Sequence, residues 1–277
     1  MKKVLFIINP LSGTDRIKAL QKDIEKNLDL NVFDYEIIYT QFPNHGEILA
    51  VEGVKKNFDI IVAVGGDGSV NDVIKGLYGS PAILGIIPMG SGNGLARSLK
   101  IPLNEVKAIQ LLNTFHIQEI DVGKADGHLF ASNAGVGFDQ VVTDEFSNNQ
   151  RRGFLAYIGI ILKNIWFYKP KKWTIEIDGK TTKTNSFMLT VANAVQLGYG
   201  FQIAPKSKID DGYFDLVNVK KFPVLLASLI ALRAFSGTIH KSRFVTTQKI
   251  KKVRISHPEL NQFQLDGENL PCGNEII

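Results

Sequence analysis

The chain has 277 residues, of which 44% are hydrophobic and 21% are charged. These proportions exclude a disordered or fibrous protein and supply enough apolar side chains for two domains or one large one. The net charge of +5 is mildly basic, which is compatible with an anionic membrane surface or a nucleotide as partner. Cys272 is the sole cysteine. An intramolecular disulfide is therefore excluded, and a reducing, cytoplasmic environment is expected.

We expect neither a targeting segment nor a membrane-spanning helix. The apolar run at residues 4–8 follows Lys2 and Lys3, but it is too short for a signal peptide and predicts a first strand. The longest apolar segments, residues 154–168 and 224–235, are shorter than the span of about 20 residues that a bilayer requires. The five histidines show no metal-ligand spacing, so no zinc site is expected.

Strand and helix patterns alternate through the first part of the chain. Such alternation predicts an α/β domain with a mostly parallel sheet that is covered on both faces. Ligands in this architecture bind beyond the carboxyl ends of the strands. The expected strands are residues 4–8, 35–40, 60–64 and 83–87, and the expected helices are residues 16–28, 47–56, 70–77, 94–99 and 104–112.

From about residue 116 the pattern changes to β-rich stretches separated by polar turns, which predicts a mainly antiparallel second domain. We therefore predict an α/β domain at residues 1–115 and a β-rich domain at residues 116–277. The expected strands of the second domain are residues 118–124, 128–134, 173–177, 186–192, 212–219, 244–247 and 252–257, with helices at residues 140–147, 153–167 and 223–235.

A glycine-rich turn, Gly65-Gly66-Asp67-Gly68-Ser69, lies between an expected buried strand and a helix. Glycine has no Cβ, so the backbone can approach an anionic group closely, and the helix N-terminus presents unpaired N–H groups. We expect Ser69 to cap this helix. Asp67 puts a carboxylate where phosphates would lie, which indicates Mg²⁺ or a charge-positioning role in phosphoryl transfer. An ordinary strand–helix turn is the alternative.

Two further turns follow expected strand ends. Asn9 offers an amide after the first strand. In the turn after the fourth strand, Gly90 opens the backbone, Ser91 supplies a hydroxyl, and Asn93 can hydrogen-bond to a base, a phosphate or a metal-bound water. Each turn alone is also common as a plain structural turn. Because all three follow parallel strands, we expect them to converge at one edge of the sheet.

The chain carries an ordered set of short motifs. They are NPxSG at residues 9–13, GGDGS at 65–69, PxGSGN at 88–93, IDVGK at 120–124, GFD at 137–139, DDG at 210–212 and DGE at 266–268. Together they resemble the diacylglycerol kinase catalytic-domain family, which includes bacterial lipid kinases and sphingosine kinases. The resemblance implies an active site in the cleft between an α/β domain and a β-rich domain.

The resemblance also implies which residues hold ATP. Thr40, Ser91 and the stretch from Gly65 to Asn71 fall where the family binds the nucleotide, and Asp67 falls at the carboxylate tied to Mg²⁺ and the phosphates. The complete set of candidates for ATP binding is Asn9, Thr40, Gly65, Gly66, Asp67, Gly68, Ser69, Asn71, Gly90, Ser91 and Asn93.

The remaining implied roles lie in the second domain. Glu268 falls at the general base that takes the proton from the lipid hydroxyl, and such a base accelerates a reaction by roughly 10² to 10⁴. Asp211 matches a Mg²⁺ site in which the backbone carbonyls of Lys208 and Tyr213 join its carboxylate, and oxygen ligands suit this cation. Asp121 falls where the family carries an acidic residue near the domain junction, and the resemblance implies only a supporting role for it. Without the resemblance, DDG and DGE would be exposed turns.

These features predict an ATP- and Mg²⁺-dependent lipid kinase that phosphorylates a hydroxyl of diacylglycerol, a sphingoid base or a related membrane lipid. Gly94 stands where many bacterial lipid kinases carry Asp and sphingosine-type members a small residue, so the class of lipid stays open. One alternative is an NAD kinase-like enzyme, whose family shares a GGDG turn. A non-catalytic nucleotide- or lipid-binding regulator is the other.

The expected partners are ATP and a lipid at the membrane surface, and a homodimer stays open. No nucleic acid is expected, because the basic strip at residues 249–254 has no interleaved aromatic side chains. The aromatic and aliphatic segment at residues 153–168 predicts peripheral attachment to the inner membrane surface, and a plain core helix is the alternative. The basic residues that flank this segment are Arg151, Arg152, Lys169, Lys171 and Lys172.

Overall fold

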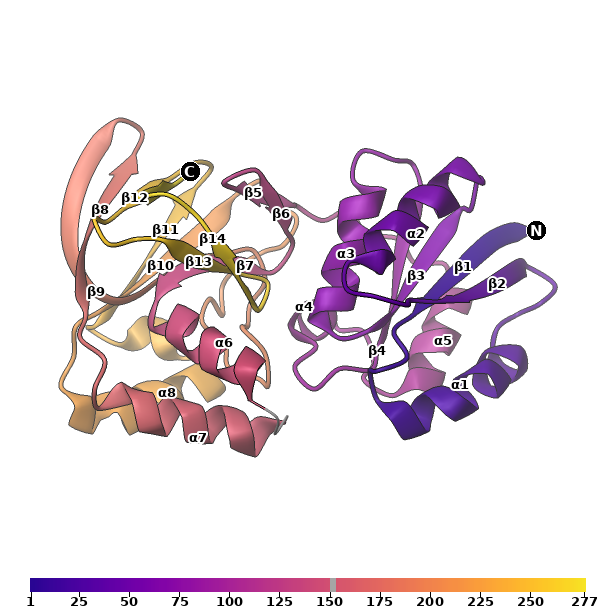
Figure 1. Ribbon diagram of the computed structural model, residues 1–277, viewed down its shortest axis with the longest axis horizontal. Helices are drawn as coiled ribbons and strands as arrows, with labels where there is room; N and C mark the ends of the chain where they lie inside the picture. The colour runs from indigo at the N-terminus through magenta and orange to yellow at the C-terminus, as the bar shows by residue number, and fades with distance from the viewer. Residues whose placement is uncertain (150–152) are drawn as a thin grey trace. The chain divides into compact units, whose positions relative to one another are not determined.

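The computed structural model describes residues 1–149 and 153–277 (Figure 1), so Arg151 and Arg152 lie outside the described residues. The chain divides into two compact units, Met1–Glu119 and Ile120–Ile277, whereas we expected the boundary after residue 115. Within the described residues, no helix is both long and apolar enough to cross a membrane.

The first unit contains a four-stranded parallel sheet in the order β2-β1-β3-β4. Its third strand in the chain is buried along its whole length, as expected for a parallel sheet covered on both faces. The predicted α/β architecture is therefore confirmed. The strands are β1 (Lys2–Ile8), β2 (Phe33–Tyr39), β3 (Ile60–Gly65) and β4 (Ile83–Pro88).

Helices cover both faces of this sheet, as Figure 1 shows. On one face, α1 (Thr14–Asn27) and α5 (Glu105–Asn113) share a buried core with alternate residues of the strands. On the other face, α2 (His45–Lys55) packs so closely that a Cβ on its Gly53 would lie 2.8 Å from the side chains of Leu5 and Ile61. The remaining helices are α3 (Asp67–Leu77) and the short α4 (Gly94–Ser98).

The second unit contains a nine-stranded sheet whose paired strands are all antiparallel, which confirms the predicted β-rich domain. The main path is β14-β13-β7-β9-β8-β12-β15, with β10 paired to β9 and β11, and β5 and β6 form a separate pair. The strands are β5 (Gly123–Ala125), β6 (His128–Phe130), β7 (Asn133–Gly137), β8 (Lys171–Ile177), β9 (Lys180–Ala192), β10 (Phe214–Lys220), β11 (Val245–Ile250), β12 (Arg254–Ser256), β13 (Gln262–Leu265), β14 (Glu268–Pro271) and β15 (Glu275–Ile276).

Hydrophobic cores lie on both sides of the second sheet. One core combines the sheet with α6 (Phe138–Asn148), α7 (Phe154–Ile165) and α8 (Ala227–Phe235). The other surrounds the fully buried Trp173. All three helices fall where the sequence predicted them, with bounds that differ by a few residues. Two 3₁₀ turns, η1 (Val224–Leu226) and η2 (Ile239–Lys241), flank α8.

The structure corrects two strand predictions in this unit and contains three strands that were not predicted. Only β5 forms within residues 118–124, because the backbone of Asp121 is bound to the loop carbonyl of Ile209 instead of a strand. The expected strand at residues 128–134 is two strands, since the backbone of residues 131 and 132 is bound by the Asp266 carboxylate. The strands β13, β14 and β15 were not predicted, because each has only two to four residues. β13 pairs with β7 and β15 with β12, both earlier in the chain, whereas β14 pairs with β13 across a tight hairpin.

Candidate active site

Three turns meet at the carboxyl edge of the first sheet. The backbone N–H of Asn9 donates to the carbonyl of Val64 at 3.0 Å, and its side-chain amide donates to the Ser69 hydroxyl at 3.2 Å. The N–H of Met89 donates to the Gly65 carbonyl at 2.8 Å. These bonds tie the ends of β1, β3 and β4 together, so the predicted convergence of the turns is confirmed.

The glycines of two of these turns are in backbone contact. A Cβ added to Gly90 would lie 2.5 Å from the Cα of Gly66, and a Cβ added to Gly65 would collide with the side chain of Ser69. Gly66 itself has an extended backbone, with φ −90° and ψ −170°. Glycine is therefore required here by close approach of two chain segments, and left-handed backbone geometry is not the reason.

The helix α3 begins at Asp67, so the expectation that Ser69 caps it is wrong. Gly66 is the N-cap residue, and no side chain makes a capping bond. Ser69 lies in the first turn, where its hydroxyl accepts the bond from Asn9. Because no side chain caps them, the first backbone N–H groups of this helix are suited to an anion.

Asp67 is half-buried beside the turn after β4. Its Oδ1 accepts a bond from the N–H of Leu95 at 3.4 Å, and the N–H groups of Asn93 and Gly94 also point to the carboxylate. Burial raises the pKa of Asp67, while these backbone donors act in the opposite direction. Asp67 thus links the phosphate-type turn to the start of α4.

The other predicted nucleotide residues have different surroundings. Asn93 is buried and uses both side-chain atoms within its own turn, where Oδ1 accepts from the N–H of Gly90 at 3.1 Å and Nδ2 donates to its carbonyl at 2.8 Å. Ser91 is exposed, and Thr40 directly follows β2 at the same sheet edge. Asn71 is buried on α3 with an Oδ1 that has no hydrogen-bond partner among the described residues.

Glu268 is the first residue of β14 and is exposed. It follows the two-residue turn Asp266–Gly267, in which φ is 47° and 92°. Positive φ at both central residues is typical of the tight turns that match the right-handed twist of hairpin strands. Leu265 lies opposite Glu268 in the hairpin. The carboxylate of Glu268 therefore projects from a rigid turn.

Asp266 fixes this turn to the rest of the unit. Its buried carboxylate accepts three backbone bonds, from Ala131 at 2.8 Å, Ser132 at 2.9 Å and Asn133 at 2.8 Å. Such charge-assisted bonds are about twice as strong as neutral ones. This positioning role was not predicted, because an Asp-Gly pair predicts the turn and carries no information on a partner loop so distant in the chain.

The predicted metal residue Asp211 is bound to a lysine. Its Oδ2 lies 2.7 Å from the Lys249 ammonium, and its Oδ1 accepts from the N–H of Tyr213 at 3.2 Å. The bond from Lys249 lowers the pKa of Asp211. Lys249 also lies 3.6 Å from the buried Asp215. Asp121 stabilises the same turn by accepting from the N–H of Gly212 at 2.7 Å.

The two candidate Mg²⁺ positions differ in how well they fit the ion. Among the side chains that the structure describes, no three His, Cys, Asp or Glu residues lie close enough to hold a metal. Magnesium typically binds one or two carboxylates together with substrate phosphates, and Asp67 fits that mode. At Asp211 both carboxylate oxygens already have partners, so a cation would have to displace Lys249. The set of Lys208, Asp211 and Tyr213 stays a prediction.

A buried carboxylate of the GFD motif had no predicted role. Asp139 lies at the start of α6 and accepts bonds from the N–H of Gln140 at 2.8 Å and the hydroxyl of Thr190 at 3.3 Å. Burial raises the pKa of Asp139 to about 7. This pKa shift could not be predicted from the sequence, because burial of one side chain depends on the packed structure.

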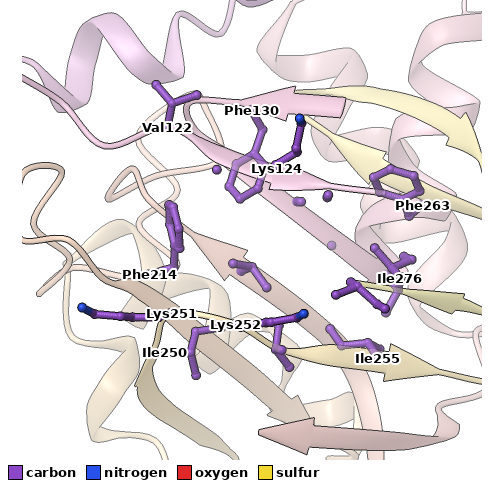
Figure 2. A pocket seen from close by; sticks show the side chains of 18 residues that line it. Val122, Lys124, Phe130, Phe214, Ile250, Lys251, Lys252, Ile255, Phe263 and Ile276 are labelled. Carbon is purple, nitrogen blue, oxygen red and sulfur yellow. The ribbon is translucent and has the colours of Figure 1, made fainter. Parts of the chain in front are cut away.

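An apolar pocket of about 350 Å³ lies within the second unit (Figure 2). Aromatic and aliphatic side chains such as Phe130, Phe214 and Phe263 form its wall, and the polar side chains that line it are all lysines. None of the predicted catalytic or metal residues lines it. Because its side chains include no carboxylate or hydroxyl, this pocket has no group of its own for proton transfer from an alcohol.

An α/β unit with phosphate-type turns, followed by an antiparallel β unit, defines a class of two-domain kinases, and comparisons with known proteins agree. Residues 3–125 match the model of the diacylglycerol kinase catalytic domain. Residues 132–274 match the model described as the YegS C-terminal NAD kinase beta sandwich-like domain. The chain belongs to the diacylglycerol kinase catalytic-domain family, and it is a kinase that transfers phosphate to a hydroxyl.

Individual relatives cover nearly the whole chain. A protein named diacylglycerol kinase from Bacillus subtilis (strain 168) is 30% identical over 97% of this chain and 90% of its own length. A protein with the same name from Staphylococcus saprophyticus is 29% identical over 96% of this chain and 89% of its own length. A solved structure from Bacillus anthracis str. Sterne, provisionally assigned as a diacylglycerol kinase, has a TM-score of 0.81 at 27% identity, covering 99% of this chain and 93% of that one.

Proposed function

We propose that this lipid kinase is ATP- and Mg²⁺-dependent and that it phosphorylates the hydroxyl of diacylglycerol. The observation that carries the proposal is the set of three turns bound together beside Asp67 at the carboxyl edge of the parallel sheet. The similarity of nearly the whole chain to proteins named diacylglycerol kinase supports the choice of acceptor.

In this proposal the ATP phosphates lie over the glycines at the start of α3. The uncapped N–H groups of α3 donate to phosphate oxygens, and Gly66 and Gly90 have no side chains that would keep an anion away from the backbone. Asp67 holds negative charge beside the phosphates, and Mg²⁺ when bound there neutralises the charge that develops on them. Asn71 offers a buried oxygen without a hydrogen-bond partner among the described residues, and Thr40 and Ser91 offer hydroxyls.

Glu268 is the proposed proton acceptor. As the hydroxyl oxygen of the lipid bonds to the γ-phosphorus, its proton passes to the Glu268 carboxylate and ADP leaves. Asp266 holds the hairpin that carries Glu268, which limits how far the base can move. The predicted second Mg²⁺ at Lys208, Asp211 and Tyr213 would stabilise the neighbouring turn and takes no part in the transfer.

The decisive experiment incubates the purified chain with ATP, Mg²⁺ and vesicles that contain diacylglycerol, and identifies products by mass spectrometry. The expected product is the phosphorylated diacylglycerol. Parallel incubations contain a sphingoid base or NAD. Phosphorylation of NAD without vesicles would favour the NAD kinase-like alternative. ATP binding by calorimetry with no product in any incubation would favour a regulator.

Two substitutions test the assignment of the site. Asp67→Asn and Glu268→Gln should each lower turnover, the latter by roughly 10² to 10⁴, while Glu268→Gln leaves ATP affinity unchanged. Matched controls replace exposed carboxylates with amides, Asp34→Asn in the first unit and Glu259→Gln in the second. Wild-type turnover in both site variants would contradict the assignment.

A further inference from the structure

The helix α7 has two apolar stripes, and only one of them is buried. Ile160 and Ile165 belong to the core of the second unit. Leu155, Leu162 and Trp166 are 84%, 60% and 61% exposed. These three residues are spaced by seven and four positions, so they share one face of the helix. A helix that is apolar on opposite faces usually needs a partner on each.

The segment formed by η1 and α8 repeats this arrangement. Ile230 and Ala234 lie in the same buried core, whereas Leu225, Leu229 and Leu232 are 82%, 45% and 66% exposed. Their spacing of four and three positions again puts them on one side. Soluble proteins rarely expose so many large apolar side chains together, and contiguous patches of this kind mark interaction sites.

The two helices lie side by side on one side of the second unit, as Figure 1 shows. The rings of Phe154 at the start of α7 and Phe235 at the end of α8 are 6.1 Å apart. The two exposed stripes therefore lie on adjacent helices. We call them the α7–α8 apolar face, which consists of Leu155, Leu162, Trp166, Leu225, Leu229 and Leu232.

A cationic groove adjoins this face. It has a volume of about 390 Å³ and shares Leu229 with the face. Its other lining side chains include Arg233, Lys241 and Arg243, and none of the described residues that line it carries a carboxylate. The Arg233 guanidinium donates to the Lys241 carbonyl at 3.2 Å, which holds one cation in place. Guanidinium and ammonium groups suit phosphate oxygens.

We propose that the α7–α8 apolar face inserts into the interfacial layer of an anionic phospholipid bilayer while the cationic groove binds lipid phosphates. Apolar side chains beside Lys and Arg are the combination that holds a helix in this layer, and Trp166 has the ring type enriched at such interfaces. The inference rests on the proposed function in one respect, namely that the acceptor is a bilayer lipid.

Charge favours a bilayer over a second copy of the chain. A two-fold contact through this face would bring two cationic grooves to one interface, where Arg233, Lys241 and Arg243 of both copies would repel one another. Anionic lipid headgroups are instead attracted by about 1 kcal/mol per Lys or Arg close to the surface. The predicted homodimer, if formed, should use another surface.

Trp166 provides a native reporter for the test. The chain has two tryptophans, and Trp173 is only 2% exposed, so a change in emission on membrane binding should come from Trp166. With vesicles of phosphatidylglycerol and phosphatidylcholine, we expect a blue shift and co-sedimentation, both weaker with phosphatidylcholine alone or at high salt. Trp166→Phe should abolish the shift while co-sedimentation persists.

Three double variants locate the binding surface. Leu155→Gln with Leu162→Gln, and Leu229→Gln with Leu232→Gln, should each lower vesicle affinity at least about tenfold. Lys241→Gln with Arg243→Gln should lower it roughly 30-fold on anionic vesicles and little on neutral ones. The matched control is Leu30→Gln with Ile48→Gln, which replaces residues of the first unit that are 46% and 47% exposed and should bind like the wild type.

The outcomes separate this inference from the proposed function. Phosphate transfer to diacylglycerol in detergent micelles should survive in the Leu155 and Leu162 double variant, whereas transfer on vesicles should fall. Vesicle binding by a wild type that phosphorylates no lipid would support the docking surface and contradict the function. Wild-type vesicle binding by every variant, or a dimer that these variants dissociate in the absence of vesicle binding, would overturn the docking surface.

Discussion

Gly66 and Gly90 bring two turns of the first unit into backbone contact, such that a Cβ on Gly90 would lie 2.5 Å from the Cα of Gly66. The turns follow β3 and β4, whose last paired residues are Gly65 and Pro88. Asp67 reinforces the contact through the N–H of Leu95. The two turns are therefore packed against each other, and a change in one of them should alter the other.

Gly90→Ala should weaken ATP binding at least about tenfold. The added Cβ would also lie 2.8 Å from the Asn93 Oδ1, so the turns must separate, and overpacking of this kind typically costs 1–3 kcal/mol of unfolding free energy. Calorimetric titration with ATP and thermal melts measure the two effects. Gly273→Ala is the control, because a Cβ there meets nothing within 4 Å. Equal ATP affinity in both variants would show that the turns tolerate separation.

Asp266→Asn should destabilise the second unit. The amide keeps one acceptor oxygen for three backbone N–H groups, so the expected loss of unfolding free energy is about 2–4 kcal/mol. Hydrogen exchange should increase at residues 131–133. Asp178→Asn is a matched control, because Asp178 opens a similar Asp-Gly turn, with φ 50°, but its side chain is exposed. A similar melting temperature in both variants would refute the positioning role.

Asp139→Asn should change how stability depends on pH. In the folded protein the pKa of Asp139 is about 7, above its ordinary value of 3.8, so the folded state binds the proton more tightly than the unfolded chain does. The free energy of unfolding should therefore fall as pH rises from about 4 to about 7, by at most roughly 4 kcal/mol.

Denaturant titrations across this pH range measure the effect. Asp139→Asn should flatten the decline and make the protein more stable than the wild type above neutral pH. Asp144→Asn, an exposed carboxylate on the same helix, should retain the decline. An unchanged slope in Asp139→Asn would assign the pH dependence to another group.

Lys249→Met should make the stability of the protein depend on Mg²⁺. In the wild type the ammonium of Lys249 already neutralises Asp211 and Asp215, so Mg²⁺ without ATP should shift the melting temperature little. Without Lys249, Asp211 becomes available to a divalent cation. Thermal melts with and without Mg²⁺ measure this, with the exposed Lys252→Met as control. If Mg²⁺ does not change the melting temperature of Lys249→Met, the result would argue against the predicted Mg²⁺ site at Lys208, Asp211 and Tyr213.

Local patterns predicted much of the fold. Buried apolar runs and helical periods identified every strand of the first sheet and the main helices, because those signals depend on residues adjacent in sequence. The strand β14 pairs with the adjacent β13 and was missed because it has only four residues. The short strands β13 and β15 were not predicted, since they pair with β7 and β12, which lie earlier in the chain. The start of α3 was misplaced for a related reason. The hydroxyl of Ser69 is bound by Asn9 of another turn, so it was unavailable as a cap.

By itself the sequence determined the order of the motifs, the α/β and β-rich halves, and the residue types around Asp67 and Glu268. Only the tertiary structure decided that Gly66 must approach Gly90, that Asp266 holds the hairpin of Glu268, that Lys249 occupies Asp211, and that burial raises the pKa of Asp139. The physical reason is the range of each interaction. Turn and helix preferences act within a few residues, whereas desolvation and charge pairing depend on groups that folding brings together from distant parts of the chain.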